Sequence, residues 1–213
     1  MKKFLLLAFA ACLTFAAQAV TMSWSLNEGE AATNKLISTP VSGGQACASA
    51  SFTLLLTFNT SDITEEVNIA DFGQWNRGHS YIKMYPGNDD VGFNTPNKAT
   101  GGNYSVAYPA VTEGQSILFT MVFEKVGDST TAVTCYLNNT KVHEVTFEGL
   151  NGLNVNVTSN DAYTIESTAA YDGVLTEEQI AWMVNNQTAV LPEPTALALL
   201  ALGVAGLALR RKA

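Results

Sequence analysis

The residues that could perform acid–base or nucleophilic chemistry are few and scattered along this 213-residue chain. The two histidines are His79 and His143, and His143 alternates with Val145 and Phe147 in a pattern typical of a strand. Neither histidine has an acid and a nucleophile near it in the sequence, so a Ser-His-Asp arrangement cannot be assembled from a local motif. The carboxylates of Glu65 and Glu66 are adjacent, so in an extended chain they point to opposite faces. They are better interpreted as solvated surface residues than as a catalytic pair. We therefore expect that the protein is not an enzyme and has no catalytic residue.

Aromatic and amide side chains in loops suit carbohydrate binding better. A flat ring packs on the apolar face of a sugar, while neighbouring polar groups bond its hydroxyls. Trp75 is the best candidate, and the next two residues, Asn76 and Arg77, could bond the hydroxyls. Tyr104 and Tyr108 are further candidates. The alternative is that Trp75 packs over the edge of a sheet.

Two loop clusters carry the hard oxygen ligands that calcium prefers. One contains Asn88, Asp89 and Asp90, and the other contains Asn160 and Asp161. The alternative is that each cluster is an ordinary acidic turn, and we favour that interpretation. We therefore expect no cofactor, with structural calcium as the one exception to test.

The cysteines leave two alternatives open. Cys12 falls in the leader described below, so Cys47 and Cys135 remain as a pair that an oxidising compartment would allow to form a disulfide. Strand alternation places Cys135 on an inward face, whereas Cys47 would point to the face opposite Phe52 if it continues the strand that carries Phe52. Neither cysteine has a histidine or cysteine at metal-ligand spacing, so we do not expect a zinc site.

Composition excludes some partners. The chain has 19 acidic and 11 basic residues and a net charge of −8. Its cations are isolated along the central part of the sequence, which gives no footprint for nucleic acid. We therefore expect no nucleic-acid partner.

The N-terminal residues predict export. Lys2-Lys3 precede an apolar run from Phe4 to Phe15, and Ala17-Gln18-Ala19 supplies the small residues that signal peptidase requires. The apolar run is shorter than the roughly 20 residues of a membrane-spanning helix. Residues 1–19 are thus predicted to be a signal peptide that is removed after Ala19.

The C-terminal residues form a tripartite segment. Pro192, Glu193 and Pro194 are followed by an apolar stretch at 195–209 and by Arg210, Arg211 and Lys212. A helix over this stretch would be about 22 Å long, against a hydrocarbon core of about 30 Å. The basic end would stay cytoplasmic, leaving the bulk of the chain outside. Residues 191–213 therefore predict a short transmembrane helix, marginal as a permanent anchor.

This order of elements resembles the PEP-CTERM sorting signal of exopolysaccharide-producing Gram-negative bacteria. The resemblance implies recognition and cleavage by an exosortase near Pro192-Glu193-Pro194. It also implies a transient stay in the inner membrane, then release to the cell surface or extracellular matrix.

Between the two ends, residues 20–190 predict one all-β domain. Alternating runs rich in Val, Phe and Thr are separated by turn residues, whereas helical periodicity is nearly absent. The expected strands are 52–58, 67–72, 81–85, 117–123, 132–137, 142–147, 153–157 and 163–166. A short helix should follow Thr176, which forms a capping box with Gln179 and is flanked by the apolar pair Leu175 and Ile180.

Four segments resemble the concanavalin A-like, laminin-G-like jelly-roll superfamily. They begin at Ser51, Glu113, Cys135 and Tyr171, and the last, Tyr171–Ile180, is the most specific. The resemblance implies a β-sandwich jelly roll with one short C-terminal helix. Enzymes of that superfamily carry a Glu-x-Asp-x-x-Glu strand or a close variant, which this sequence lacks.

These observations favour a non-catalytic surface or matrix protein that binds carbohydrate or a protein partner in exopolysaccharide. A glycan hydrolase or lyase of the same fold is the alternative from another class. A purely structural envelope protein is a third. Carboxylates converging in one concave pocket would favour the enzyme.

Overall fold

The computed structural model describes residues 20–41, 44–75, 78–86, 90–96, 103–107, 110–150 and 152–192. For residues 73–75, 78–79, 90, 96 and 103–107 it describes the backbone alone. Thr21–Val190 form one compact unit. The predicted signal peptide and the apolar stretch at 195–209 lie outside the described residues. Within the described ranges, no helix is long and apolar enough to cross a bilayer.

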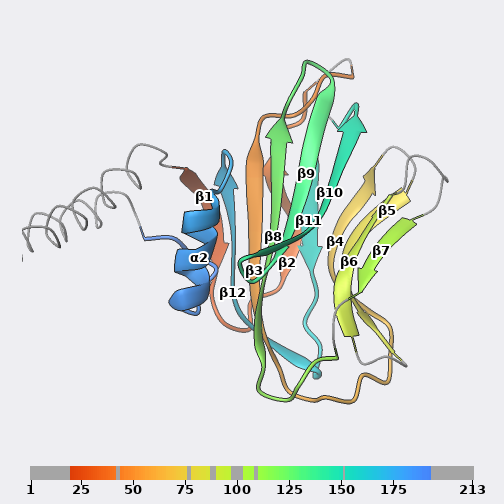
Figure 1. Cartoon of the computed structure of the whole chain (residues 1–213), viewed down its shortest axis with the longest axis vertical. Coiled ribbons are helices and arrows are strands. Elements are labelled where there is room, and N and C mark those ends of the chain that lie inside the picture. Colours follow the sequence, from red (N-terminus) through yellow and green to blue (C-terminus); the bar gives the residue numbers. More distant parts are fainter. Residues whose placement is uncertain are drawn as a thin grey trace, which may run out of the picture. The chain divides into compact units, whose positions relative to one another are not determined.

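The domain is a sandwich of two antiparallel sheets (Figure 1). The first sheet has the strand order β1 (Thr21–Leu26), β12 (Tyr163–Asp172), β3 (Ala50–Phe58), β8 (Ser116–Lys125), β9 (Thr130–Leu137) and β10 (Thr140–Glu148). The second has the order β2 (Ala32–Ser38), β11 (Leu153–Val157), β4 (Val67–Trp75), β5 (Gly78–Tyr85), β6 (Asp90–Pro96) and β7 (Asn103–Ala107). This architecture confirms the predicted all-β sandwich.

The core lies between the inner faces of the two sheets. Alternation in β3 and β8 directs one apolar row of each strand inward, including Phe52 and Phe123. Across the interface, Phe72 of the second sheet meets Phe52 edge-on, with ring centroids 5.2 Å apart. Phe93 and Phe119 form a second edge-on pair at 5.7 Å. The most apolar predicted strands are thus central to the sandwich.

All eight predicted strands are present, and four further strands were missed. β1, β2 and β7 are edge strands, and β6 begins at Asp90 inside a segment predicted to be a loop. Edge strands carry polar residues at their exposed positions, so their hydrophobic alternation is weak. They form because they pair with a neighbouring strand. In β2, for example, Asn34 and Lys35 are exposed.

The hairpin between β9 and β10 turns at Asn138 and Asn139. Asn138 has a positive φ of 53°, which asparagine tolerates better than most residues. Its side-chain oxygen also accepts a hydrogen bond from Leu118 N at 3.0 Å. The asparagine therefore fixes both the turn and its attachment to β8.

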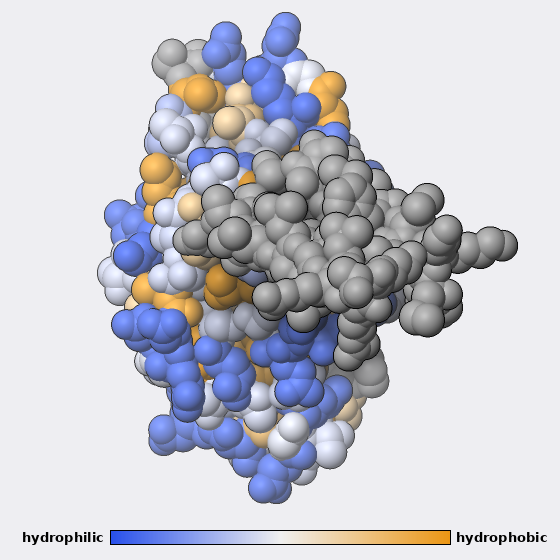
Figure 2. Space-filling view, turned by 90° about the vertical axis from the view of Figure 1, so that its left-hand side faces the viewer, coloured by the Kyte–Doolittle hydropathy of each residue, from blue (hydrophilic) through white to orange (hydrophobic). Residues whose placement is uncertain are grey.

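Helix α2 (Glu177–Asn185) begins as the sequence predicts. Gln179 N donates to Thr176 Oγ1 at 3.3 Å, and Thr176 N donates to Gln179 Oε1 at 2.9 Å. Leu175 and Ile180 are buried on either side of this cap. The helix lies beside β1 and β12 (Figure 1). Figure 2 shows that the described surface on this side is mainly hydrophilic, with hydrophobic residues scattered over it.

The disulfide that the sequence allowed is not formed. Cys47 and Cys135 are both free thiols buried in the core. Cys47 N donates to Leu150 O beyond the end of β10, and Ala46 N donates to Asp128 O in the turn before β9. Cys135 lies farther along β9, five residues past its first residue Thr130. At about 3.3 Å per residue, Cys135 lies about 16 Å along β9 from Thr130, whereas disulfides join Cα atoms within about 7 Å.

Candidate functional site

For most residues proposed from sequence for ligand binding, the structure does not describe the side chain, and their role stays a prediction. Asn76, Arg77, Tyr108, Asn88 and Asp89 lie outside the described residues. Trp75 ends β4, Tyr104 lies in β7 and Asp90 begins β6, and for these three only the backbone is described. Asn160 and Asp161 are described fully, and both line a pocket.

This pocket, which we call the rim pocket, has a volume of about 340 Å³. Its lining residues come from the β3–β4 loop and the adjacent start of β4, from the end of β5, and from the β11–β12 loop: Thr60, Asp62, Ile63, Thr64, Glu65, Val67, Met84, Asn160, Asp161 and Ala162. Small-molecule sites in proteins occupy about 300–1,000 Å³. The rim pocket therefore has the size of a site for a small ligand.

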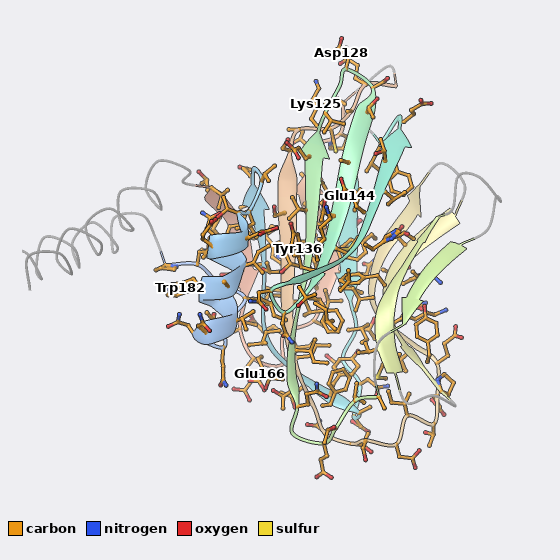
Figure 3. The ribbon with its side chains drawn as sticks, in the orientation of Figure 1. Lys125, Asp128, Tyr136, Glu144, Glu166 and Trp182 are labelled. Carbon is orange, nitrogen blue, oxygen red and sulfur yellow. The ribbon has the colours of Figure 1, made fainter. Side chains whose placement is uncertain are left out.

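The pocket lies at the end of the sandwich opposite the β8–β9 turn. Ala50 pairs with Phe123 near that turn, and β3 then runs away from it to Phe58. Asp128, at the turn, is at the top of Figure 3, and Glu166, near the start of β12, lies toward the lower end. The rim pocket is thus far from α2's cap and from both cysteines.

The β11–β12 loop is held in place by local hydrogen bonds. Asn160 Oδ1 accepts from Ala162 N at 2.9 Å, which closes an Asx turn. Asn59 Nδ2 donates to the backbone oxygen of Asp161 at 3.1 Å. Tyr163 Oη donates to Thr158 O, and burial raises the pKa of this phenol above its ordinary value. The wall bearing Asn160 and Asp161 is therefore preorganised.

The β3–β4 loop forms the opposite wall. Asp62 N donates to Thr60 Oγ1 at 3.0 Å, and Ile63 anchors the loop in the core with 3% exposure. The floor of the pocket is apolar, formed by Ile63, Val67, Met84 and Ala162. The rim carries hydroxyl, carboxylate and amide groups.

The electrostatic character of the pocket is acidic. Three lining residues carry carboxylates, Asp62, Glu65 and Asp161, and all three are exposed to solvent. Its lining includes no lysine or arginine among the residues that the structure describes. Such a site disfavours anionic ligands and suits neutral groups that donate hydrogen bonds, such as hydroxyls.

The two carboxylates Glu65 and Glu66 diverge, as the sequence predicted. Glu65 faces the pocket, whereas Glu66 forms an ion pair with Lys83 of β5. The ammonium of Lys83 also lies 5.4 Å from the ring centroid of Tyr81 and 5.8 Å from that of Tyr85. These contacts place the Lys83 charge outside the rim pocket.

His143 lies in β10, as predicted, and its Nε2 is 3.1 Å from Thr95 Oγ1 in the other sheet. Burial lowers the pKa of this imidazole below its ordinary value. The contact joins the sheets away from the rim pocket.

Sequence reasoning missed Thr60, Asp62, Thr64 and Glu65 as members of one site. A usable signal was present, because 59–66 is a run rich in oxygen-bearing side chains between two predicted strands. The one apolar residue of this run, Ile63, is buried in the structure, so the run folds back on the core. No group of metal-ligating carboxylates, histidines or cysteines large enough to hold an ion occurs among the described residues.

Comparison with solved structures finds the same sandwich in receptor-binding domains of botulinum neurotoxins. The serotype D/C binding domain has a TM-score of 0.50 and 12% identity, covering 78% of this chain and 52% of that one. The serotype D domain with N-acetylneuraminic acid has a TM-score of 0.49, 11% identity, and coverage of 80% and 47%. The DC domain with rat synaptotagmin II has a TM-score of 0.48, 12% identity, and coverage of 78% and 51%. The chain thus spans about half the length of these structures, and the likeness concerns the fold.

No curated protein matches the sequence. Residues 190–212 match the family described as the PEP-CTERM protein-sorting motif. Of the sorting residues singled out above, Pro192 is described, whereas Glu193, Pro194, Arg210, Arg211 and Lys212 lie outside the described residues. The chain is therefore a β-sandwich protein that carries a PEP-CTERM sorting motif at residues 190–212.

Proposed function

We propose that this protein is an exported, non-catalytic component of the cell surface or extracellular matrix of a Gram-negative bacterium, and that it binds neutral carbohydrate in exopolysaccharide. The rim pocket carries the proposal. Its apolar floor suits the carbon–hydrogen face of a sugar, and its rim offers acceptors for sugar hydroxyls. The fold alone would not support this role, because sandwiches of this kind host unrelated functions.

The sorting motif supports the proposed route to the cell surface. Signal peptidase would remove residues 1–19, and an exosortase would cleave near Pro192-Glu193-Pro194 after a transient stay in the inner membrane. Replacing all three residues with alanine should leave export across the membrane intact and block processing. The intact mass of the exported protein decides this point, because an exported form that retains Arg210–Ala213 contradicts processing.

A glycan array with the exported protein, followed by calorimetric titration of the best neutral glycan, tests the binding role. Asp161→Asn should weaken binding about tenfold, because it replaces a charged acceptor by a neutral one at similar volume. Asp128→Asn makes the same charge change at the opposite end of the sandwich and should leave binding unchanged. Equal affinities for the two variants would place the ligand elsewhere. A blank array would favour a purely structural envelope protein.

Three carboxylates at one pocket keep a glycan-active enzyme as the second candidate. General acid catalysis by a carboxyl group requires an environment that keeps it protonated, and burial is the usual cause. Asp62, Glu65 and Asp161 are exposed instead, which supports binding over hydrolysis. Incubation with the bound glycan should therefore release no new reducing ends. Release that Asp62→Asn abolishes would establish the enzyme.

A further inference from the structure

The segment that leads into the sorting motif is docked on the folded domain. After α2, Asn186 caps the helix and Gln187 adopts a positive φ of 49°, which turns the chain back toward the first sheet. Thr188 N donates to Met183 O at 3.1 Å. The next residue, Ala189, has an exposure of 0%.

Ala189 is held through both of its backbone groups. Its carbonyl oxygen accepts from Thr53 Oγ1 and from Tyr171 Oη, each at 2.8 Å. Its N–H donates to Ser167 Oγ at 2.9 Å. Thr53 lies on β3, whereas Ser167 and Tyr171 lie on β12. Side chains of two neighbouring strands therefore hydrogen-bond to the backbone of one residue.

The outer face of the first sheet supplies these groups from buried positions. Thr53 is 0% exposed and Tyr171 is 1% exposed. Register explains their convergence, because Thr53 pairs with Ala169 and Tyr171 with Ser51 on the same face. Buried hydroxyls require partners, and the Ala189 carbonyl serves both.

The docked residue directly precedes the sorting motif, which begins at residue 190. Val190 N donates to Thr188 Oγ1 at 3.0 Å, so the backbone on this side of Pro192 is already engaged in local contacts. A protease binds its substrate as an extended chain through main-chain hydrogen bonds on both sides of the scissile bond. Ala189 cannot offer those groups while it is docked.

We propose that docking of Thr188–Val190 on β3 and β12 limits the rate of exosortase processing, so that the folded domain itself controls access to the cleavage region. The proposal rests on the processing described under the proposed function. Cleavage then proceeds from a minor undocked population, and its rate follows that population when undocking is fast.

Pulse-chase measurement of C-terminal processing of the full chain in a sorting-competent host tests this inference. Tyr171→Phe and Thr53→Val each remove one hydrogen bond to the Ala189 carbonyl and should speed processing about fivefold. Thr53→Val also removes a longer 3.3 Å contact with Ala169 O. Thr168→Val is the matched control, since its hydroxyl is equally buried but donates to Thr53 O at 2.8 Å. It should leave the processing rate unchanged.

A second variant protects the test against misfolding. A short Gly-Ser linker inserted between Val190 and Leu191 leaves the hydrogen bonds of Thr188, Ala189 and Val190 in place and supplies accessible backbone before Pro192. It should speed processing at least as much as Tyr171→Phe, with an unchanged melting temperature. Equal processing rates for the parent, linker and Tyr171→Phe chains would overturn the inference while processing itself stands. A C-terminus retained in every chain would overturn the inference together with the processing on which it rests.

Discussion

Reducing agent is expected to leave the thermal stability of the exported protein unchanged. Cys47 and Cys135 are both free thiols buried in the core. Ala46, next to Cys47, is bonded to Asp128 in the turn before β9, whereas Cys135 lies about 16 Å along β9 from Thr130. The experiment adds an excess of dithiothreitol to the folded protein in native buffer. It has no bond to break if the register is correct.

The alternative predicts a large effect. A disulfide between these residues would close a loop of about 90 residues, and loop-closure entropy gives it a stabilisation of about 4.6 kcal/mol. For a domain of this size, each kcal/mol shifts the melting temperature by roughly 2–4 °C. Reduction would then lower the melting temperature by roughly 9–18 °C, far outside the error of calorimetry.

The assay pairs calorimetry with thiol labelling. Burial raises the pKa of the Cys135 thiol above its ordinary value, so alkylation of this cysteine should be slow in the folded protein. After unfolding without reductant, both Cys47 and Cys135 should label fully. Two results together would refute this reasoning: a melting temperature that falls on reduction, and cysteines that stay unlabelled in the unfolded protein until reductant is added.

Three further predictions concern stability. Lowering the pH from 7 toward 5 should destabilise the domain, because burial lowers the pKa of His143 below its ordinary value of 6.5 and the unfolded chain therefore takes up the proton first. The loss develops as pH falls through about 6.5 toward the folded pKa, and urea titrations of His143→Gln should show a flatter profile. Thr176→Ala should lower the free energy of unfolding by about 1 kcal/mol through loss of the capping box with Gln179, and no change in the urea midpoint would contradict the cap. Millimolar calcium should not alter the melting temperature relative to EDTA, because Asn160 Oδ1 already accepts from Ala162 N; a reproducible rise would show that the folded protein binds calcium.

Periodicity predicted the central strands of both sheets and the edge strand β10, but it missed the edge strands β1, β2 and β7 and the interior strand β6. β3 and β8 carry apolar residues on both faces, so their sequence alone indicates a central position. β6 and β7 have weaker local patterns and are defined by pairing with β5 and with each other. The short-range signal at the Thr176 cap was equally reliable, because a side chain there determines the backbone next to it.

The sequence by itself determined features that depend on neighbours along the chain: alternating strands, the capped helix and the tripartite sorting tail. Tertiary structure alone decided the sites. The rim pocket joins the loop after β3 to the loop before β12, and these loops meet only because β3 and β12 pair in a fixed register. The same register brings Thr53 and Tyr171 together on Ala189. A strand's pattern predicts which face is buried, but which strand lies beside it depends on packing of the whole core, and that packing is not encoded locally.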